Sequence, residues 1–478
     1  MTHIELLEKH VKYTNMYKPN TLYWGLGIEN ELYLEFEKKI NITQEMFLNN
    51  HKRERYSVDY YTGYKKNIME RAFLYIAKDK ILNLPLLMNS HSLSKTDSLN
   101  NPKTLYTKLA QTNPKFNGIT LSELLFSSSK YLQENYNKNF VYEGDIIEFI
   151  TLDFFNTTLE KTINELITIK NKFIETLQEI MIKNNIFNEY GSINFIQDNH
   201  PFGILLTNMN NISIFNNGTL HFNITLPTFL DDKNNIIDMN QFTKQHAIYI
   251  KLIQYMEPIL LCIYGSPDPF SYIKNKTDNP FLENIMFSSC SQRCAVSRYI
   301  SIGTYDTDIM KPGKLLTDPT FLFKVATEPY GWYKQYHDYS AYNKLSEIGY
   351  DINFRKHHNH GIELRFFDHI SDIKKIEEAF QFIIYLGDYC LSIDALDNPI
   401  ISPTWNNLVI DSMKYGLDLH LNNNYLYLFS KCFNHKFIDK TVNSLYYSIF
   451  NLLKERSIKN NSFSKYVLKK PNVIYTDV

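Results

Sequence analysis

Residues 23–37 of the chain read YWGLGIENELYLEFE, and this stretch decides the fold. Polar side chains recur with a spacing of two, at Glu29, Glu31, Tyr33 and Glu35, and the positions between them are mostly apolar. Alternation with a period of two is typical of a β-strand that has one buried face. The stretch therefore predicts a strand with one apolar face and one acidic face.

Other segments of the sequence predict further strands and several long helices. Strand patterns occur at 145–155, 201–207, 219–227 and 361–368. Helical periodicity runs through 67–79, 157–184 and 239–264 and dominates from 371 onward, and Thr157 or Thr158 is suited to cap the second helix.

The order of these segments predicts an α+β fold with a mostly antiparallel sheet, because strands alternate with long helical excursions and no repeat or Pro/Gly-rich linker divides the chain. We expect one domain over residues 1–396, with an insertion at about 38–140, and a helical C-terminal region over 397–478.

Charge and composition narrow the class of protein. The 478 residues carry 50 Lys and Arg against 51 Asp and Glu, so there is no global basic field to hold nucleic acid or an anionic membrane. The start of the chain lacks a signal-peptide pattern, and no run of about 18 apolar residues occurs. Five cysteines without a CxxC pair predict neither a disulfide framework nor a structural zinc site. We expect a cytoplasmic enzyme.

The acidic strand face is a candidate metal site. Side chains two apart on a strand lie about 6 to 7 Å apart on the same face, so Glu29 and Glu31 are spaced to hold hard cations. Magnesium prefers oxygen ligands and phosphate groups. Alternating glutamates on a solvated strand face are also ordinary, and this pair alone does not decide between the two readings.

Three further strand candidates place ionisable side chains among large apolar ones: Glu148 in DIIEFIT, His221 with Asn223 in TLHFNITLP, and Glu363 with Arg365 in GIELRFFD. Buried charge without a partner is costly, and a shared cation with a triphosphate would offset that cost. Taken singly, His221 is also compatible with a hydrogen-bonded core histidine and Glu363–Arg365 with a structural ion pair.

The chain resembles the glutamate–cysteine ligases and related carboxylate–amine ligases, whose catalytic sheet is similar to that of glutamine synthetase. The resemblance rests on five short motifs that occur in the family's order. They are Gly27-Ile28-Glu29-Asn30-Glu31, Ile147-Glu148-Phe149-Ile150-Thr151, His221-Phe222-Asn223, Ser297-Arg298-Tyr299-Ile300-Ser301-Ile302-Gly303-Thr304-Tyr305, and Ile362-Glu363-Leu364-Arg365 followed by Asp368.

The resemblance implies an enzyme that uses ATP and Mg²⁺ to activate a carboxylate and join it to an amine, with amino acids as partners. It assigns glutamate as the carboxylate substrate and leaves the amine open; cysteine as that amine would serve glutathione biosynthesis. The implied magnesium ligands are Glu29, Glu31, Glu148, His221 and Glu363. Of the remaining site residues, Asn223 and Arg365 would face the nucleotide, Arg365 would stabilise the transferring phosphoryl group, and Arg298 would pair with a substrate carboxylate or phosphate.

Several polar residues and two other functions stay open. Asp145 is a weak metal candidate because strict alternation puts it on the face opposite Glu148, and a histidine cluster at 357–360 is compatible with a loop or with phosphate binding. A metal–ATP site alone also suits phosphotransfer of the guanidino-kinase type, or a non-catalytic nucleotide-binding relative. The sequence does not determine the oligomeric state.

Overall fold

The centre of the protein is a six-stranded, fully antiparallel sheet with the order β11-β12-β8-β1-β6-β5. The structure, a computed structural model, describes residues 22–38, 41–43, 81–83, 86, 88, 118–143, 146–151, 158–196, 218–233, 235–265, 291, 304–314, 351–355, 361–459 and 463–468. The six strands are β1 (Leu22–Leu32), β5 (Phe140–Glu143), β6 (Ile146–Ile150), β8 (Thr219–Phe229), β11 (Ile352–Phe354) and β12 (Ile362–Asp368). The prediction of a mixed fold with a mostly antiparallel sheet is confirmed.

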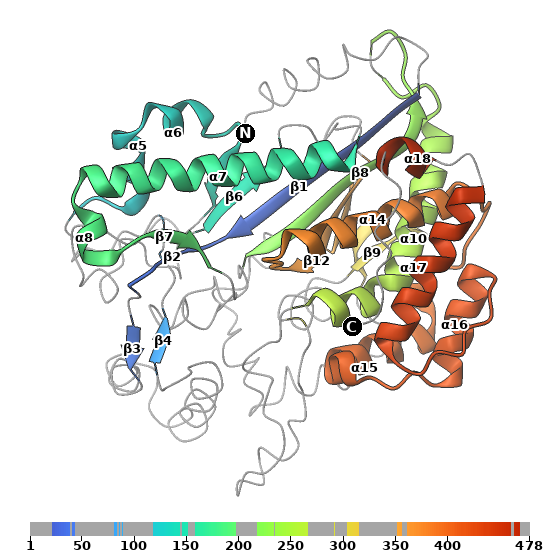
Figure 1. Ribbon diagram of the computed structural model, residues 1–478. Helices are drawn as coiled ribbons and strands as arrows, with labels where there is room; N and C mark the ends of the chain where they lie inside the picture. Colours follow the sequence, from blue (N-terminus) through green and yellow to red (C-terminus); the bar gives the residue numbers. More distant parts are fainter. Residues whose placement is uncertain are drawn as a thin grey trace, which may run out of the picture.

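Two long helices cover one face of this sheet, α7 (Leu159–Lys183) and α14 (Ile373–Cys390) (Figure 1). Ring contacts mark the packing: Phe149 of β6 lies 5.2 Å from Phe173 of α7, and Phe222 of β8 lies 4.7 Å from Phe380 of α14, measured between centroids. All four rings are buried, and most of the side chains on this face of the sheet are apolar. The apolar faces of the strands and of the two helices therefore pack together in one layer.

Thr158 caps α7 as the sequence predicts. Its backbone is extended, and its hydroxyl accepts a hydrogen bond from the Lys161 amide at 3.4 Å. A threonine in this position satisfies one of the amide groups that the first turn of a helix leaves without a partner.

Helix α10 (Met239–Tyr264) spans the predicted segment and packs against α14, where the Tyr249 hydroxyl donates to the Ile383 carbonyl at 2.6 Å. Among the described residues it is the one helix long and apolar enough to cross a membrane. Because 83% of its apolar window is buried inside the protein, the helix is accounted for as part of the core.

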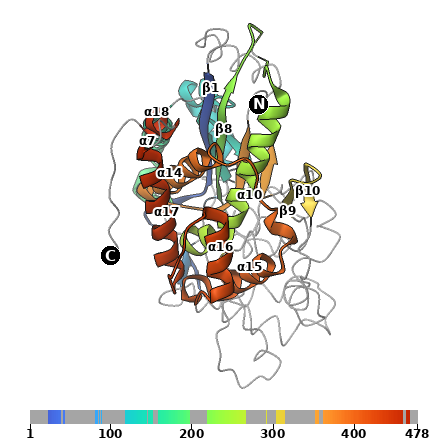
Figure 2. The same cartoon turned by 90° about the vertical axis from the view of Figure 1, so that its right-hand side faces the viewer.

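The predicted C-terminal helices are present and share the core of the sheet. They are α15 (Pro403–Tyr415), α16 (Asn423–Phe433), α17 (Val442–Lys459) and α18 (Phe463–Leu468), with single turns η6 (Pro399–Ile401) and η7 (Gly416–Asp418). Figure 2 shows α15 to α17 gathered beside α10 and α14. The buried Trp405 donates its indole N–H to the Gln254 carbonyl of α10 at 2.9 Å, so this region is tied directly to the helices of the preceding domain.

Two parts of the fold differ from the expectation. The strand predicted over 23–37 breaks at Tyr33, after which β2 (Leu34–Phe36) leaves the main sheet and pairs with β7 (Ile193–Phe195). Tyr33 is buried between two buried leucines, which interrupts the alternation of faces. Glu35 therefore lies in the small sheet and not on the acidic face of β1.

The stretch expected to form an insertion includes parts of the main domain. Its end forms α5 (Leu121–Ser128), α6 (Lys130–Asn135) and the edge strand β5, none of which the sequence patterns predict. The remaining described elements are β3 (Asn41–Thr43), β4 (Ile81–Asn83), α8 (Ile186–Tyr190), β9 (Thr304–Asp306) and β10 (Lys311–Lys314). The helix expected at 67–79 and the strand expected at 201–207 lie outside the described residues.

A lysine of α7 is held beneath β1. Lys170 donates to the Asn30 side-chain oxygen at 3.0 Å, and its ammonium lies 5.0 Å from the centre of the Phe195 ring. Burial disfavours the charged form and lowers the pKa of Lys170 to about 8.

Truncating Trp405 is expected to destabilise the sheet and the C-terminal helices together. Trp405→Ala removes a fully buried indole and should lower the free energy of unfolding by about 3–5 kcal/mol, measured by urea denaturation followed by circular dichroism. Trp405→Phe keeps most of the ring but leaves the Gln254 carbonyl unpaired, so its loss should be smaller, about 1–3 kcal/mol. Separate melting of the C-terminal helices, with the remainder unchanged, would contradict a shared core.

Lys170 predicts an alkaline dependence of stability. Because its pKa is lower in the folded protein than in the unfolded chain, the folded state releases the proton first, and stability should rise from about pH 8 toward the unfolded value of about 10.4. Below about pH 8 the contribution should be flat. Lys170→Met should remove this rise, which is read as the difference between the two proteins' unfolding free energies at each pH. A difference that does not vary over this range would exclude the lowered pKa.

Candidate functional site

The register of the central strands brings the predicted site residues to one face of the sheet. On β1, Glu31 stands opposite Glu148 of β6, and Glu29 stands opposite His221 of β8. Directly opposed residues of an antiparallel pair point to the same face. The carboxylates of three strand positions and one imidazole therefore share the face opposite to α7 and α14.

The next rung of the ladder adds two more groups to this face. Asn223 of β8 stands between Gly27 of β1 and Glu363 of β12. The sheet thus aligns side chains that are up to 336 positions apart in the chain, counting from Gly27 to Glu363. The spacing in the sequence shows which residues of one strand share a face. The pairing register shows which residues of adjacent strands lie side by side.

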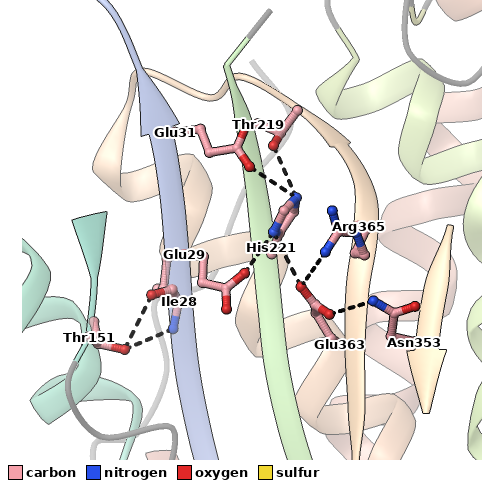
Figure 3. A network of polar contacts seen from close by, with 9 residues as sticks. All are labelled: Ile28, Glu29, Glu31, Thr151, Thr219, His221, Asn353, Glu363 and Arg365. Carbon is pink, nitrogen blue, oxygen red and sulfur yellow. Dashed lines mark hydrogen bonds and ion pairs between the residues drawn. The ribbon is translucent and has the colours of Figure 1, made fainter. Parts of the chain in front are cut away.

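His221 lies at the centre of the polar contacts (Figure 3). Its Nδ1 is 2.8 Å from Glu29 Oε2 and 3.4 Å from Glu363 Oε1, and its Nε2 is 3.0 Å from Thr219 Oγ1 and 3.7 Å from Glu31 Oε1. The imidazole is 1% exposed. One ring therefore links carboxylates from both neighbouring strands.

Glu363 is held from two sides. Arg365 donates Nη1–H to Oε1 at 2.9 Å, and Asn353 of β11 donates Nδ2–H to Oε2 at 2.8 Å (Figure 3). Arg365 is therefore beside the carboxylate cluster, as the sequence predicts. Two donors on different oxygens fix both the position and the rotation of the Glu363 carboxylate.

Four carboxyl groups gather in this cluster, those of Glu29, Glu31, Glu148 and Glu363. Among the described residues, the cationic groups that pair with carboxylates of this cluster are the Arg365 guanidinium and, when it is protonated, the His221 imidazole. Glu29, Glu31 and Glu363 are at most 3% exposed. The Glu31 Oε2 atom has no hydrogen-bond partner within the described ranges. Buried like charges at this separation require protons or cations to offset their repulsion.

The donor set fits a divalent cation. Glu29, Glu148 and His221 each offer a ligand atom, and these three atoms lie within 4.8 Å of one another. Opposite ligands around Mg²⁺ are about 4.2 Å apart, twice the metal–oxygen distance. Small rotations of these side chains would therefore close the trio around one ion. Glu31, with its unpaired oxygen, and Glu363 are the adjacent carboxylates.

The described part of the chain contains most, but not all, of the predicted site. Glu29, Glu31, Glu148, His221, Asn223, Glu363 and Arg365 lie on the strands as described above. Arg298, Asp145 and the histidines at 357–360 lie outside the described residues.

Three residues of the network were not predicted. Thr219 and Asn353 contact His221 and Glu363 directly, and Thr151 closes the end of β6 by accepting the Ile28 amide at 2.9 Å. Thr219 is two positions before His221 on the same strand, so the sequence pattern already places both side chains on one face. Asn353 lies in a short strand far from the motifs, and only the pairing of β11 with β12 reveals it.

Comparisons with known proteins give one relative in sequence. No family model matches the chain. The uncharacterized protein R704 of Acanthamoeba polyphaga mimivirus is 39% identical over 414 residues, which cover 86% of this chain and 71% of the mimivirus protein. The chain belongs to the family of this mimivirus protein. Membership in the mimivirus protein's family assigns no activity, because that protein is itself uncharacterized.

A solved structure matches with low similarity. The crystal structure of a bifunctional glutathione synthetase from Pasteurella multocida aligns with 98% of this chain at 10% identity and a TM-score of 0.30. This chain spans about half, 52%, of that protein. A likeness of this degree carries no argument about fold or activity, and the site has to be interpreted from its own geometry.

Asn353 is expected to position Glu363 for cation binding. Asn353→Ala removes the donor to Oε2 and lets the carboxylate rotate, which should weaken binding of Mg²⁺ or Mn²⁺ by about 10- to 100-fold, as loss of an outer-shell partner typically does. Isothermal titration of the purified protein measures the affinity. Asn194→Ala, an exposed asparagine of β7, is the matched control and should bind as the wild type does. Equal affinities in all three proteins would show that Asn353 has no such role.

Proposed function

We propose that this protein is an ATP- and Mg²⁺-dependent carboxylate–amine ligase whose sheet is of the glutamine synthetase type. The observation that carries the proposal is the cluster of four carboxylates and one imidazole that four adjacent strands bring to one sheet face. This charge distribution is suited to cations that also bind phosphate oxygens.

The proposed magnesium ligands are Glu29, Glu31, Glu148, His221 and Glu363. Bound Mg²⁺ would neutralise the charge that develops as a γ-phosphoryl group moves to a carboxylate oxygen. The separation of the groups along the strands supports more than one ion. His221 contributes nitrogen, so Mn²⁺ is expected to replace Mg²⁺ readily.

Two arginines and one amide would bind the substrates. Arg365 is fixed by Glu363 through Nη1, and its planar fork has further donors for phosphoryl oxygens. Arg298 would pair with a substrate carboxylate or phosphate, and Asn223, whose motif alone implies a place near the nucleotide, would lie beside the reacting groups. These roles follow the family motifs that the residues occupy.

The substrates follow from the resemblance to carboxylate–amine ligases. Glutamate would supply the carboxylate, through its γ-carboxyl group, and a small amine such as that of cysteine would be the acceptor. The carboxylate oxygen attacks the γ-phosphorus of ATP, and ADP leaves. The amine nitrogen then attacks the acyl carbon, releasing phosphate and forming an amide.

The test incubates the full-length protein with ATP, Mg²⁺, glutamate and a panel of amines that includes cysteine, and follows ADP, phosphate and new amide by mass spectrometry. Release of phosphate that depends on the amine, together with an amide product, is the expected result. A stable phosphorylated acceptor would instead identify a phosphotransferase of the guanidino-kinase type. Nucleotide binding without either product would indicate a non-catalytic relative.

Variants of the carboxylate cluster show whether its residues act in a functional site or only in the structure. Glu31→Ala and Arg365→Ala should abolish turnover, a loss of at least 100-fold, while the unfolding midpoint stays near that of the wild type, because neither side chain belongs to the apolar core. Glu35→Ala, in the small β2–β7 sheet, is the matched control and should keep full activity. If the wild type and Glu29→Ala bind Mg²⁺–ATP equally, the proposed metal site is wrong.

A further inference from the structure

Asn223 is a buried amide whose hydrogen-bonding capacity is unused. Its side chain is 0% exposed, and neither Nδ2 nor Oδ1 has a hydrogen-bond partner in the parts of the chain that the structure describes. Nearly all buried polar groups in folded proteins are paired, because an unpaired one costs free energy. A residue kept in this state on the face of a proposed active site points to a ligand that supplies the partners.

Next to Asn223, two consecutive positions of β1 on this face carry no side chain. Gly27 stands opposite Asn223, and Gly25 stands opposite Thr225, so two consecutive inward positions of β1 are glycine. Glycine weakens a strand interior and is found where a ligand or another backbone approaches closely. The other neighbour, Glu363, already accepts hydrogen bonds on both oxygens from Arg365 and Asn353.

The position of Gly25, Gly27 and Asn223 along the strands indicates which part of the proposed reaction the surface they form would serve. Asn223 is two residues beyond His221, which is about 7 Å along the strand. A nucleotide base lies a ribose and two phosphates away from the transferred γ-phosphoryl group. The surface formed by Gly25, Gly27 and Asn223 is therefore next to the reacting atoms.

An amide side chain offers one donor group, NH₂, and one acceptor group, the carbonyl oxygen, and its ligand must offer the complement. A carboxylate or acyl phosphate only accepts hydrogen bonds, whereas an amine donates them. We propose that Asn223, above the bare strand of Gly25 and Gly27, binds both reacting groups: Nδ2–H donates to the acyl oxygen and Oδ1 accepts from the attacking amine. This inference rests on the proposed ligase function and assigns the site of its second step.

The second step then balances as follows. The amine nitrogen forms a bond to the acyl carbon, the bond from that carbon to the phosphate oxygen breaks, and phosphate leaves with the electron pair. The nitrogen loses one proton to solvent and keeps the N–H that faces Oδ1. Asn223 orients the amine and stabilises the negative charge that develops on the acyl oxygen.

The experiment uses full-length protein with Mg²⁺–ATP, each of the 20 amino acids as carboxylate donor, and hydroxylamine as the amine probe, with hydroxamate as the product measured. For Asn223→Ala we expect hydroxamate formation to fall on the order of 100-fold, the KM for hydroxylamine to rise, and Mg²⁺–ATP affinity to stay within about 3-fold. We also expect a higher unfolding midpoint, because the variant removes an unsatisfied buried amide. Gly27→Val, which fills the bare strand, should raise the KM of the amino acid.

Asn406→Ala is the matched control, since Asn406 is a buried asparagine whose amide donates to the Ile400 and Ser402 carbonyls. It should lower the unfolding midpoint and leave hydroxamate formation unchanged. A lower midpoint in Asn223→Ala, or unchanged kinetics in both site variants, would overturn the inference. If the wild type binds Mg²⁺–ATP but forms no hydroxamate with any amino acid, the inference fails while the metal site stands; if it binds no Mg²⁺–ATP, the proposed function itself fails.

Discussion

The repulsion among four carboxylates held on one sheet face is the interaction on which the rest of the structure depends. Glu29, Glu31, Glu148 and Glu363 come from three strands, and the His221 imidazole lies between Glu29 and Glu363. Holding such groups together requires a rigid framework, because unrestrained side chains would turn outward to water. The apolar opposite face, packed on α7 and α14, supplies that framework: the strands cannot shift by one residue without exposing their phenylalanines.

One face of the sheet therefore packs against the helices and the other carries the polar cluster, and each face constrains the other. Phe149 and Phe222 fix the register of β6 and β8 from below, and that register decides which polar groups meet above. A slip of either strand would move the carboxylates into the apolar layer as well as the rings out of it. Stability and site geometry thus share one determinant, which is the pairing of β1 with its two neighbours.

Sequence patterns predicted the central strands and the long helices because those segments have strong, uninterrupted periodicity. Glu29, Glu31 and His221 were recognisable because polar residues interrupted apolar strands at a regular spacing. Asn353 was not predictable, since its role depends on the pairing of two short strands. The break at Tyr33 was also missed, because a tyrosine fits the polar face of the sequence pattern, and its burial appears only in the folded chain. Local periodicity in the sequence indicates which face of a strand a residue occupies. Which residues lie next to it on other strands depends on the tertiary pairing of the strands.

The site also cannot exist before the sheet is complete. Its groups lie between positions 29 and 365 of the chain, so no local segment brings even three of the proposed ligands together. A cation that binds only the folded sheet would stabilise it by an amount that grows with the ratio of free ion to dissociation constant. Carboxylates whose mutual repulsion would oppose folding in the absence of cations would then favour it in their presence. Burying carboxylates on a rigid face would in this way make the fold and the proposed cation mutually dependent.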